Sequence, residues 1–287
     1  MTFSPSSELP SDLIDQVRMS LSPEAFLGWE AALPFGPGRV ARGHCEGALE
    51  QLEAAIGPLP ELPGSDPECI RVVPTECLEQ AKSWPGFHDG RAWMHTAGSV
   101  RVAPELQPSP GDRVLDLCAA PGSKAGHLGW MMKNQGELVV NEQSRIRSQR
   151  LRRNLKLMNI DATVLTGPGE SLGRRLGPTF DRVLVDVPCS GTGRVWLGDP
   201  KTWAEWSPRA VKRLAKLQRM LLHSGLAALK PGGTLVYSTC SLLEDENEAV
   251  IQKIPDDVII EHTMRYTPAR TEPLIEEGFF LARLRRV

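Results

Sequence analysis

The feature that most constrains the fold is the alternation, from Gly111 onward, of short β-branched runs with longer segments of helical periodicity. Consecutive parallel strands need a crossover helix between them, so the alternation predicts an α/β domain on a mostly parallel sheet. We expect strands at residues 113–118, 137–142, 162–166, 181–187 and 233–240, and helices at 124–133, 145–158 and 208–229, with one more starting near Glu244. Residues 279–286 alternate apolar and polar side chains, which predicts an antiparallel edge strand.

The preceding part of the chain has a different pattern. Up to about Pro110 it is broken by proline and glycine, with short helical stretches such as 46–56 between the breaks. A chain of 287 residues that is 41% hydrophobic can bury one large core and a smaller appended one. We therefore predict a small N-terminal accessory lobe over residues 1–107 and the α/β domain over residues 108–287.

Charge and targeting signals narrow the function classes. The 33 basic and 35 acidic residues give a formal charge of −2, so any nucleic-acid site has to be local. Residues 1–12 lack the basic-then-apolar order of a signal peptide, and no apolar run approaches the roughly 18 residues of a membrane span. These observations predict a cytoplasmic protein with no membrane contact.

The six cysteines show neither a CxxC pair nor a zinc-ligand spacing, so we expect no disulfide and no metal. A buried cysteine is usually a small apolar filler. We expect that structural role for the cysteines of the N-terminal part, which are Cys45, Cys69 and Cys77.

A run of small residues follows the first expected strand and leads into a helix. Small side chains let a ligand approach the backbone, and a helix N-terminus supplies free N–H groups. The expected cofactor-binding residues in this turn are Cys118, Ala119, Ala120, Pro121, Gly122, Ser123 and Lys124. Glu142 ends the next strand about 20 positions later, where a carboxylate can accept hydrogen bonds from ribose hydroxyls. The sequence has neither a GxGxxG fingerprint nor a phosphate loop, so a smaller nucleoside cofactor, S-adenosylmethionine, fits best.

Two further cysteines lie at the carboxyl ends of expected strands. Cys189 follows the strand at 181–187, and Cys240 ends the strand at 233–240. If these strands are neighbours at a spacing near 4.8 Å, the two thiols face one pocket within roughly 10 Å of each other. Such a pair indicates chemistry rather than packing.

Two thiols, a carboxylate and a methyl donor suit one reaction in particular. Carbon 5 of cytosine is a poor nucleophile, but a thiolate that adds to carbon 6 turns the ring into an enamine whose carbon 5 attacks an electrophilic methyl group. Asp186 is placed to stabilise the adduct at ring nitrogen 3, and Cys189 to assist the final release. Cys240 has to ionise as the nucleophile, in a partly accessible site where helix N-termini or basic side chains lower its pKa.

From about Gly90 to its end the chain resembles the Sun-domain (NSUN, RsmB/RsmF-like) RNA cytosine-5 methyltransferases. The matching segments are residues 115–124, 186–191 and 237–241, the triplet Glu246-Asn247-Glu248, and the terminal Gly278-Phe279-Phe280. The resemblance implies a Rossmann-like class I methyltransferase with a mostly parallel seven-stranded sheet, S-adenosylmethionine as cofactor and RNA as partner. The compact N-terminal lobe and the lack of a long basic tail favour a bacterial-type enzyme of ribosomal RNA, with transfer RNA second, and we expect a monomer.

The resemblance also implies roles for individual residues. In that family the cysteine of the Thr-Cys motif is the nucleophile, here Cys240, and the cysteine of the Pro-Cys motif aids product release, here Cys189. Asp186 and Lys124 complete the implied catalytic set, and Asp186 with Glu142 also lines the cofactor pocket. DNA enzymes attack from a Pro-Cys cysteine, so possession of both cysteines favours RNA.

The sequence departs from the family pattern in three places. The family usually has Asp where this chain has Pro168, which leaves Glu170 as the nearest acid for the cofactor's adenine edge. An aromatic residue followed by Gln-Asp is usual where this chain reads Trp93-Met94-His95-Thr96, and Glu142 stands where Asp is commoner. The stretch at 33–52, centred on Arg39, resembles a reduced form of the family's N-terminal RNA-binding region.

Local positive charge falls on two expected helices, at 145–158 and 208–229. A solvated helix face is the ordinary explanation for such charge. The helix at 208–229 follows the Pro-Cys loop and is the better candidate for phosphate contact, and the nearby Trp196, Trp203 and Trp206 can stack on unpaired bases or pack in the core. Three rival functions remain: a methyltransferase acting on adenine or protein, a non-catalytic RNA-binding or assembly protein with the same fold, and a dithiol redox protein. An adenine enzyme has no use for Cys240, and the absence of CxxC argues against redox chemistry.

Overall fold

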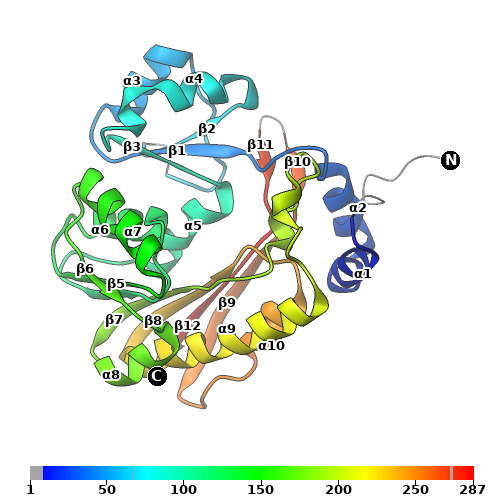
Figure 1. The fold of residues 1–287 in the computed structure, drawn as a ribbon. Helices are drawn as coiled ribbons and strands as arrows, with labels where there is room; N and C mark the ends of the chain where they lie inside the picture. The colour runs from blue at the N-terminus through cyan, green and yellow to red at the C-terminus, as the bar shows by residue number, and fades with distance from the viewer. Residues whose placement is uncertain (1–8, 67, 272–273) are drawn as a thin grey trace.

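The computed structural model describes residues 9–66, 68–271 and 274–287 of the chain. Of the segment 1–12, for which we expect no signal peptide, the first eight residues lie outside that description. A seven-stranded sheet forms the centre, and a three-stranded sheet packs above one end of it (Figure 1). Among the described helices, none is both long and apolar enough to cross a membrane.

The central sheet has the strand order β6-β5-β4-β7-β8-β12-β9. Its strands are β4 (Arg113–Asp116), β5 (Glu137–Glu142), β6 (Thr163–Thr166), β7 (Phe180–Asp186), β8 (Leu229–Thr239), β9 (Val258–Tyr266) and β12 (Phe279–Arg286). The chain builds one half outward from β4 and then returns to β4 to build the other, so strand order reverses between β4 and β7. Ligands of open α/β sheets bind at the carboxyl ends of the strands beside such a reversal.

Helices cover both faces of this sheet. They are α5 (Ala97–Leu106), α6 (Ser123–Met131), α7 (Arg145–Leu157), α8 (Leu172–Leu176), α9 (Pro208–Ala228) and α10 (Glu248–Ile251), with the short 3₁₀ turns η4 (Gly169–Ser171), η5 (Thr192–Arg194), η6 (Pro200–Thr202) and η7 (Glu244–Glu246). On β7, Val183 packs on the layer of α9 with Leu222, whereas the next residue, Leu184, packs on the layer of α6 and α7 with Leu151. Both faces are therefore dry, which is why the central strands read as continuous apolar runs.

The position of the edge strand corrects the sequence interpretation. Residues 279–286 do pair antiparallel, but β12 lies between β8 and β9, and the antiparallel edge strand of the sheet is β9. The first six residues of β12 are largely buried because both of its faces are covered, whereas most of β9 is exposed. An apolar-polar alternation in the last residues was therefore a poor guide to which strand ends the sheet.

The N-terminal part contains more regular structure than its proline and glycine content suggests. Its elements are α1 (Ser11–Ser20), α2 (Pro23–Ala32), β1 (Arg39–Gly43), α3 (Ala48–Ile56), β2 (Ile70–Val73), η2 (Thr75–Cys77), α4 (Leu78–Ser83), η3 (Pro85–Phe87) and β3 (Ala92–His95). A small sheet of order β2-β1-β3 carries α3 and α4, while α1 and α2 pack with Leu242 and Val211 of the α/β part. A two-stranded ribbon of β10 (Ala269–Thr271) and β11 (Leu274–Glu276) contacts α2. The boundary at 107/108 stays a prediction, and α5 contacts both β1 and the central sheet.

Candidate active site

The two thiols expected at one edge of the sheet lie side by side. β7 and β8 are parallel neighbours with Asp186 opposite Ser238, and their following loops carry Cys189 and Cys240. The two Sγ atoms are 3.0 Å apart. Both side chains are half-buried, so the pair is reachable from a cavity rather than sealed in the core.

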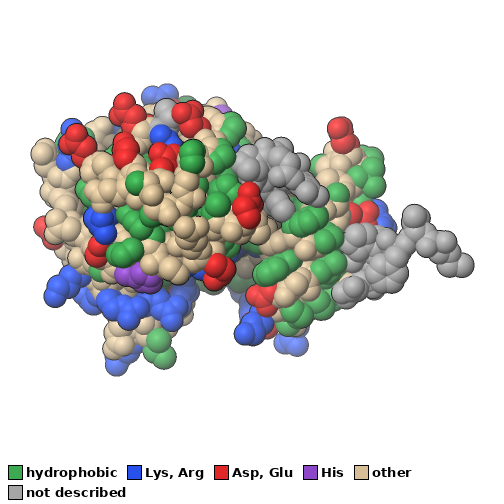
Figure 2. All heavy atoms as spheres, turned by 90° about the horizontal axis from the view of Figure 1, so that it is seen from above, with side chains coloured by type: hydrophobic (Ala, Val, Ile, Leu, Met, Phe, Trp, Pro, Cys, Tyr) green, Lys and Arg blue, Asp and Glu red, His purple; other side chains and the backbone are tan. Residues whose placement is uncertain are grey.

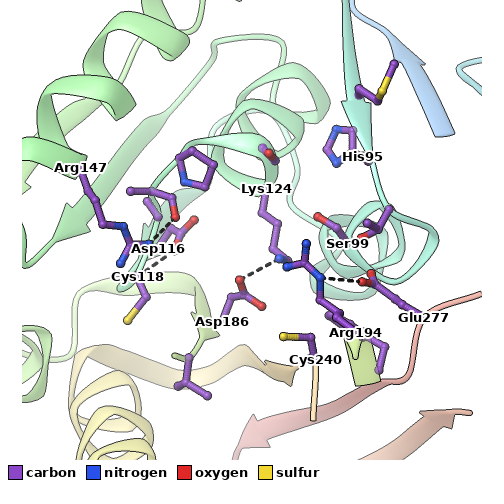
Figure 3. Close-up of a pocket in the computed structure, with 18 of the residues that line it drawn as sticks. His95, Ser99, Asp116, Cys118, Lys124, Arg147, Asp186, Arg194, Cys240 and Glu277 are labelled. Carbon is purple, nitrogen blue, oxygen red and sulfur yellow. Dashed lines mark hydrogen bonds and ion pairs between the residues drawn. The ribbon is translucent and has the colours of Figure 1, made fainter. Parts of the chain in front are cut away.

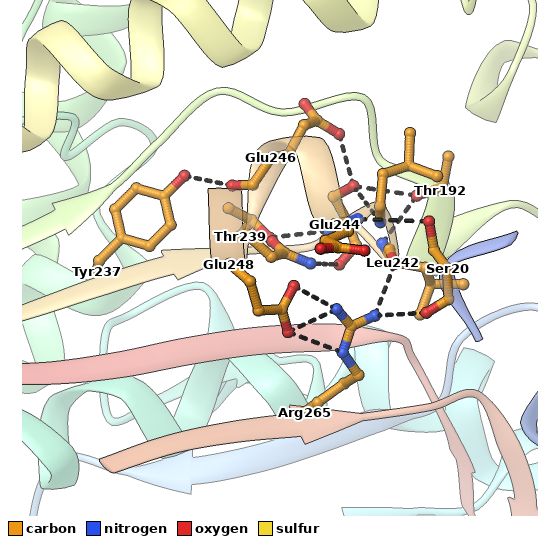
Figure 4. Close-up of polar contacts among 12 residues, drawn as sticks. Ser20, Thr192, Tyr237, Thr239, Leu242, Glu244, Glu246, Glu248 and Arg265 are labelled. Atoms are coloured by element: carbon orange, nitrogen blue, oxygen red, sulfur yellow. Dashed lines mark hydrogen bonds and ion pairs between the residues drawn. The ribbon is translucent and has the colours of Figure 1, made fainter. Parts of the chain in front are cut away.

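A buried carboxylate ties the two cysteine loops together (Figure 4). Glu246 accepts hydrogen bonds from the backbone N–H of Ser190 at 2.9 Å and from the hydroxyl of Ser241 at 2.5 Å, and a further one from the Ser190 hydroxyl. Ser190 follows Cys189 and Ser241 follows Cys240, so one side chain sets the position of both thiols. Gln218 of α9 donates a fourth hydrogen bond at 2.9 Å, which anchors Glu246 itself.

The residues after Glu246 rigidify the loop that follows β8. The Thr239 hydroxyl donates to Asn247 Oδ1 at 2.6 Å, and Asn247 Nδ2 donates to the carbonyl of Ser241 at 2.9 Å. Arg265 of β9 pairs with Glu248 at 2.5 Å and donates to the Leu242 carbonyl at 2.7 Å (Figure 4). The loop that carries Cys240 is therefore held on both sides.

An ion pair connects the thiols to the first helix. Lys124 Nζ lies 2.7 Å from Asp186 Oδ2 (Figure 3). The Ser238 hydroxyl donates to Asp186 Oδ1 at 2.7 Å. Burial lowers the pKa of Lys124, but the attraction of Asp186 outweighs it and the pKa is raised. Lys124 is thus a fixed cation, and the carboxylate of Asp186 is oriented toward the cavity.

The turn after β4 forms the opposite wall. Asp116 ends the strand, and its Oδ1 accepts from the backbone N–H of Cys118 at 3.2 Å while Oδ2 has no partner among the described residues. Burial, followed by the charge of Asp186, raises the pKa of Asp116 to about 7. Burial raises the pKa of Cys118 well above its usual range, so this thiol is not a nucleophile. Gly122 has φ +114°, a left-handed conformation that lets α6 begin at Ser123.

Glu142 lies at the carboxyl end of β5 with its side chain buried. Its Oε1 accepts from the backbone N–H of Ser144 at 2.8 Å, and Oε2 is 3.4 Å from Arg147, which also donates to the Ala120 carbonyl at 2.9 Å. Arg147 therefore bridges the second strand's acid and the turn after β4. Glu170 lines the same recess as Glu142, although Pro168 occupies the place of the family's usual acid.

The walls enclose two connected spaces. A cavity of about 470 Å³ lies between the turn after β4 and Cys240, and a groove of about 800 Å³ continues from it under the N-terminal part. Arg39, Arg194 and Cys240 line both spaces. Cys240 therefore stands where the cavity meets the groove. In the part of the chain that the structure describes, no group of His, Cys, Asp and Glu is arranged to hold a metal ion.

Electrostatics distinguish the two sulfurs. The pKa of Cys240 is lowered, chiefly by the hydrogen bond with Cys189, although burial opposes the shift; the guanidinium of Arg194 acts in the same direction as the hydrogen bond. The pKa of Cys189 is raised well above its usual range by that same hydrogen bond and by burial. The opposite directions of the two shifts make Cys240 the more readily ionised sulfur and Cys189 the one that keeps its proton more tightly.

Comparison with known proteins identifies the family of this chain. The family model described as 16S rRNA methyltransferase RsmB/F matches residues 103–285. This chain belongs to the RsmB/F family. It is 36% identical over 214 residues to the ribosomal RNA small subunit methyltransferase F of Shewanella amazonensis, covering 72% of this chain and 45% of that protein. It is 40% identical over 192 residues to the enzyme of that name in Escherichia coli, covering 61% of this chain and 40% of that protein.

A relative from outside the bacteria and two solved structures are also similar to this chain. The 26S rRNA (cytosine-C(5))-methyltransferase nsun-1 of Caenorhabditis elegans is 36% identical over 194 residues, covering 66% of this chain and 29% of that protein. This chain thus spans less than half the length of these relatives. A methyltransferase homologue from Pyrococcus horikoshii superposes with TM-score 0.71 and 26% identity over 97% of this chain and 100% of that one. NSun6 of the same organism, solved with SFG, has the same fold at TM-score 0.82 and 19% identity over 97% of this chain and 98% of that one.

Most of the expected site residues of this RsmB/F member line the cavity. Cys189 lines the groove and Glu142 the recess that it shares with Glu170, whereas Gly122 lines none of these spaces. Sequence reasoning missed other residues of the cavity. Asp116, Arg194 and Glu277 also line the cavity. Asp116 could have been predicted from the sequence because it is the last residue of the first strand of the central sheet. Arg194 and Glu277 lie in loops that reach the cavity only through the tertiary fold, so the sequence carries no local signal for them. Of the three tryptophans, Trp203 and Trp206 pack with α1 and α2, and Trp196 donates to the Pro34 carbonyl at 3.3 Å.

Proposed function

We propose that this chain is an S-adenosylmethionine-dependent RNA methyltransferase that forms 5-methylcytosine, most readily in ribosomal RNA. The observation that carries the proposal is the pair of thiols, with sulfurs 3.0 Å apart, where the cavity of about 470 Å³ meets the groove. No other chemistry among the alternatives needs two adjacent thiols with pKa values shifted in opposite directions beside a fixed Lys124–Asp186 pair.

The residues of the cavity between the turn after β4 and Cys240 fit S-adenosylmethionine. The cofactor carries a positive sulfonium and amino group, and the pocket offers the unpartnered Oδ2 of Asp116 together with Asp186. Glu142 and Glu170 line a smaller recess of about 140 Å³ that shares Cys118, Ala120 and Asp186 with this cavity, where Glu142 is placed to accept from ribose hydroxyls and Glu170 to meet the adenine edge. When bound, the cofactor supplies an electrophilic methyl group.

The chain's own residues perform the covalent steps. The Cys240 thiolate adds to carbon 6 of cytosine, forming a carbon–sulfur bond and moving the ring electrons toward carbon 5 and nitrogen 3. Negative charge develops at ring nitrogen 3, and the Lys124 ammonium bound to Asp186 offsets it, while Asp186, also held by Ser238, accepts a hydrogen bond from the cytosine 4-amino group. Carbon 5 thereby becomes the nucleophile for methyl transfer.

Release requires the reverse electron flow. The proton on carbon 5 passes to solvent water in the groove, its electron pair restores the double bond between carbons 5 and 6, and the bond between carbon 6 and the Cys240 sulfur breaks. Cys189 adjoins that sulfur and holds a proton under the same conditions, so it assists elimination as the thiolate departs. The two sulfurs therefore serve separate halves of the cycle.

The groove supplies the route for RNA. It is lined by Arg39, Lys82 and Arg194 and by the aromatic Trp196 and Phe35, which suits a phosphate backbone with unpaired bases. Figure 2 shows further Lys and Arg side chains gathered on the side where Figure 1 places α6 and α7. The exposed basic residues of α7 are Arg145, Arg147, Arg150, Arg152, Arg153 and Lys156.

Ribosomal RNA is favoured over transfer RNA by the matches to enzymes named for small-subunit and 26S rRNA. A catalytically weak assembly factor with the same fold is the alternative that Pro168 suggests. We further propose that the protein acts in the cytoplasm as a monomer.

The test is methyl transfer from radiolabelled S-adenosylmethionine to ribosomal and transfer RNA, with nucleoside mass spectrometry of the product. Bisulfite sequencing of RNA from cells with and without the protein then locates the position. We expect 5-methylcytosine at one cytosine of ribosomal RNA. Methylation of transfer RNA alone would reassign the substrate, and cofactor binding with no methylation of either RNA would support the assembly factor.

A further inference from the structure

Arg194 lies beside the Cys240 sulfur at the mouth of the cavity. It ends the 3₁₀ turn η5 after the Pro-Cys loop, and its Nε is 3.3 Å from Oε2 of Glu277. Figure 3 shows Arg194 reaching between Glu277 and Cys240, with Lys124 and Asp186 on the other side of the sulfur. Half of the Arg194 side chain is exposed to the groove, whereas Glu277 is buried.

A backbone crossing fixes this position. The N–H of Gly193 donates to the Cys240 carbonyl at 3.0 Å, and the N–H of Gly278 donates to the Gly193 carbonyl at 2.7 Å. A Cβ on Gly193 would come within 2.1 Å of the Gly278 carbonyl oxygen, so the two segments can approach this closely only because residue 193 is glycine. Arg194 and Glu277 are the neighbours of these two glycines, and the crossing therefore presents both side chains to Cys240.

We propose that Arg194 is the counter-cation that keeps Cys240 ionised and oriented for attack. The inference rests on the proposed function and assigns a catalytic residue to it. Arg194 is suited to the role because its contact with Glu277 lacks hydrogen-bond geometry, and Glu277 Oε2 has no hydrogen-bond partner among the described residues. The other nearby cation, Lys124, is already bound to Asp186 at 2.7 Å.

The charges around Cys240 agree with this role. The facing groups are Cys189, Arg194, Glu277, Asp186 and Lys124. Burial lowers the pKa of Arg194, but Cys240 and then Glu277 raise it, with a net increase. Of the facing groups, the two carboxylates oppose a thiolate at Cys240 and Arg194 favours it, after the hydrogen bond from Cys189.

Arg39 provides a matched control within the same groove. It lines both spaces with Arg194 and Cys240, but its Nη1 donates to the Pro37 carbonyl at 2.8 Å rather than to the sulfur. Burial lowers the pKa of Arg39, and the charge of Arg194 lowers it further. If the pKa of the Cys240 thiol depended only on the overall positive potential of the groove, removing Arg39 or Arg194 would change that pKa by a similar amount.

The experiment follows alkylation of Cys240 by neutral iodoacetamide between pH 5 and 10 in the full-length protein, with peptide mass spectrometry to separate Cys240 from the other cysteines. Arg194→Met should move the inflection upward by about one pH unit. Arg194→Lys should return the inflection most of the way to its value in the unmodified protein. Arg39→Met should move the inflection clearly less than Arg194→Met does. Thermal melts of all variants check that they remain folded.

No shift in Arg194→Met, or an equal shift in Arg39→Met, would overturn the role of Arg194. Because alkylation needs neither RNA nor cofactor, this outcome is independent of whether the protein methylates RNA. In methylation assays Arg194→Met should lose about tenfold at pH 7 and recover toward pH 9. A loss that stays constant with pH would also contradict the proposal, and inactivity of the unmodified protein would count against the proposed function alone.

Discussion

The two ends of the active-site cavity are built on different principles. At the cofactor end, the walls are backbone and carboxylates with loosely satisfied partners: Asp116 Oδ2 has none among the described residues, and Glu142 Oε2 faces Arg147 at 3.4 Å. At the thiol end, Glu246 alone accepts four hydrogen bonds and fixes both cysteine loops. One end can exchange its contacts for a ligand, and the other holds two sulfurs in place.

This difference teaches how binding and chemistry divide. A cofactor that must enter and leave each cycle needs acceptors that are not committed within the protein. A nucleophile that must form and break a bond needs a fixed approach, because a displacement of about 1 Å costs orders of magnitude in rate. Substitutions at the two ends should therefore change different measured quantities.

Cys240→Ala should separate the two ends most strongly. Without the thiolate no adduct forms, so we expect methyl transfer to fall by at least about a thousandfold. The dissociation constant for S-adenosylmethionine, measured by calorimetry, should stay within about twofold because the turn after β4 is untouched. Cys77→Ala, at a half-buried cysteine of the N-terminal part, is the control. Activity of Cys240→Ala above a few per cent would show that another group is the nucleophile.

Glu246→Ala should damage the thiol end without touching the cofactor end. Loss of a buried acceptor of four hydrogen bonds should cost about 3 kcal/mol of unfolding free energy and lower methyl transfer about a hundredfold. Asp245→Ala, next to it and exposed, should change neither. Chemical denaturation and rate measurements check both values, and a normal rate in Glu246→Ala would mean that the loops are positioned by other contacts.

Asp116 gives the cofactor end a pH signature of its own. Burial raises its folded pKa to about 7 from 3.8, so the folded state holds the proton more tightly than the unfolded state. The contribution to stability is present below about pH 4 and is lost as pH rises through about 7. Asp116→Asn should remove this decline and gain about 4 kcal/mol relative to the unmodified protein between pH 4 and pH 8.

Denaturation at several pH values tests this expectation, with the exposed Asp161→Asn as control. Parallel stability curves for Asp116→Asn and the unmodified protein would show that Asp116 ionises normally.

Glu142→Ala should have the smallest effect, confined to binding. Loss of the ribose acceptor should weaken S-adenosylmethionine about tenfold while the rate at saturating cofactor stays within about threefold. Glu137→Ala, at the exposed start of the same strand, should leave the affinity unchanged. An unaltered affinity in Glu142→Ala would move the ribose to another part of the pocket.

The sequence predicted the central strands because burial on both faces makes them continuous apolar runs between glycine and proline breaks. It missed β9, whose side chains are mostly exposed, and for that reason it placed the sheet edge at 279–286. The edge position depends on which segment packs last, which local pattern does not encode.

The candidate site divides in the same way. Cys189, Cys240 and Asp186 were predictable because each follows a parallel strand, and such strands share one carboxyl edge. Glu246, Arg194 and Glu277 were not assigned roles, because their approach to the thiols depends on loops that cross after the sheet has formed. Side chains that act through a loop crossing leave no spacing signal.

The most direct test of the account is the fate of RNA on Cys189→Ala. If Cys240 attacks and Cys189 completes elimination, this variant should add to cytosine, transfer the methyl group and then stall as an RNA–protein conjugate. Denaturing electrophoresis with labelled RNA should show the conjugate in Cys189→Ala and none in Cys240→Ala or the double variant. Reduced activity with no conjugate would make Cys189 a packing residue. A conjugate that persists without Cys240 and requires Cys189 would contradict the account and exchange the roles of the two sulfurs.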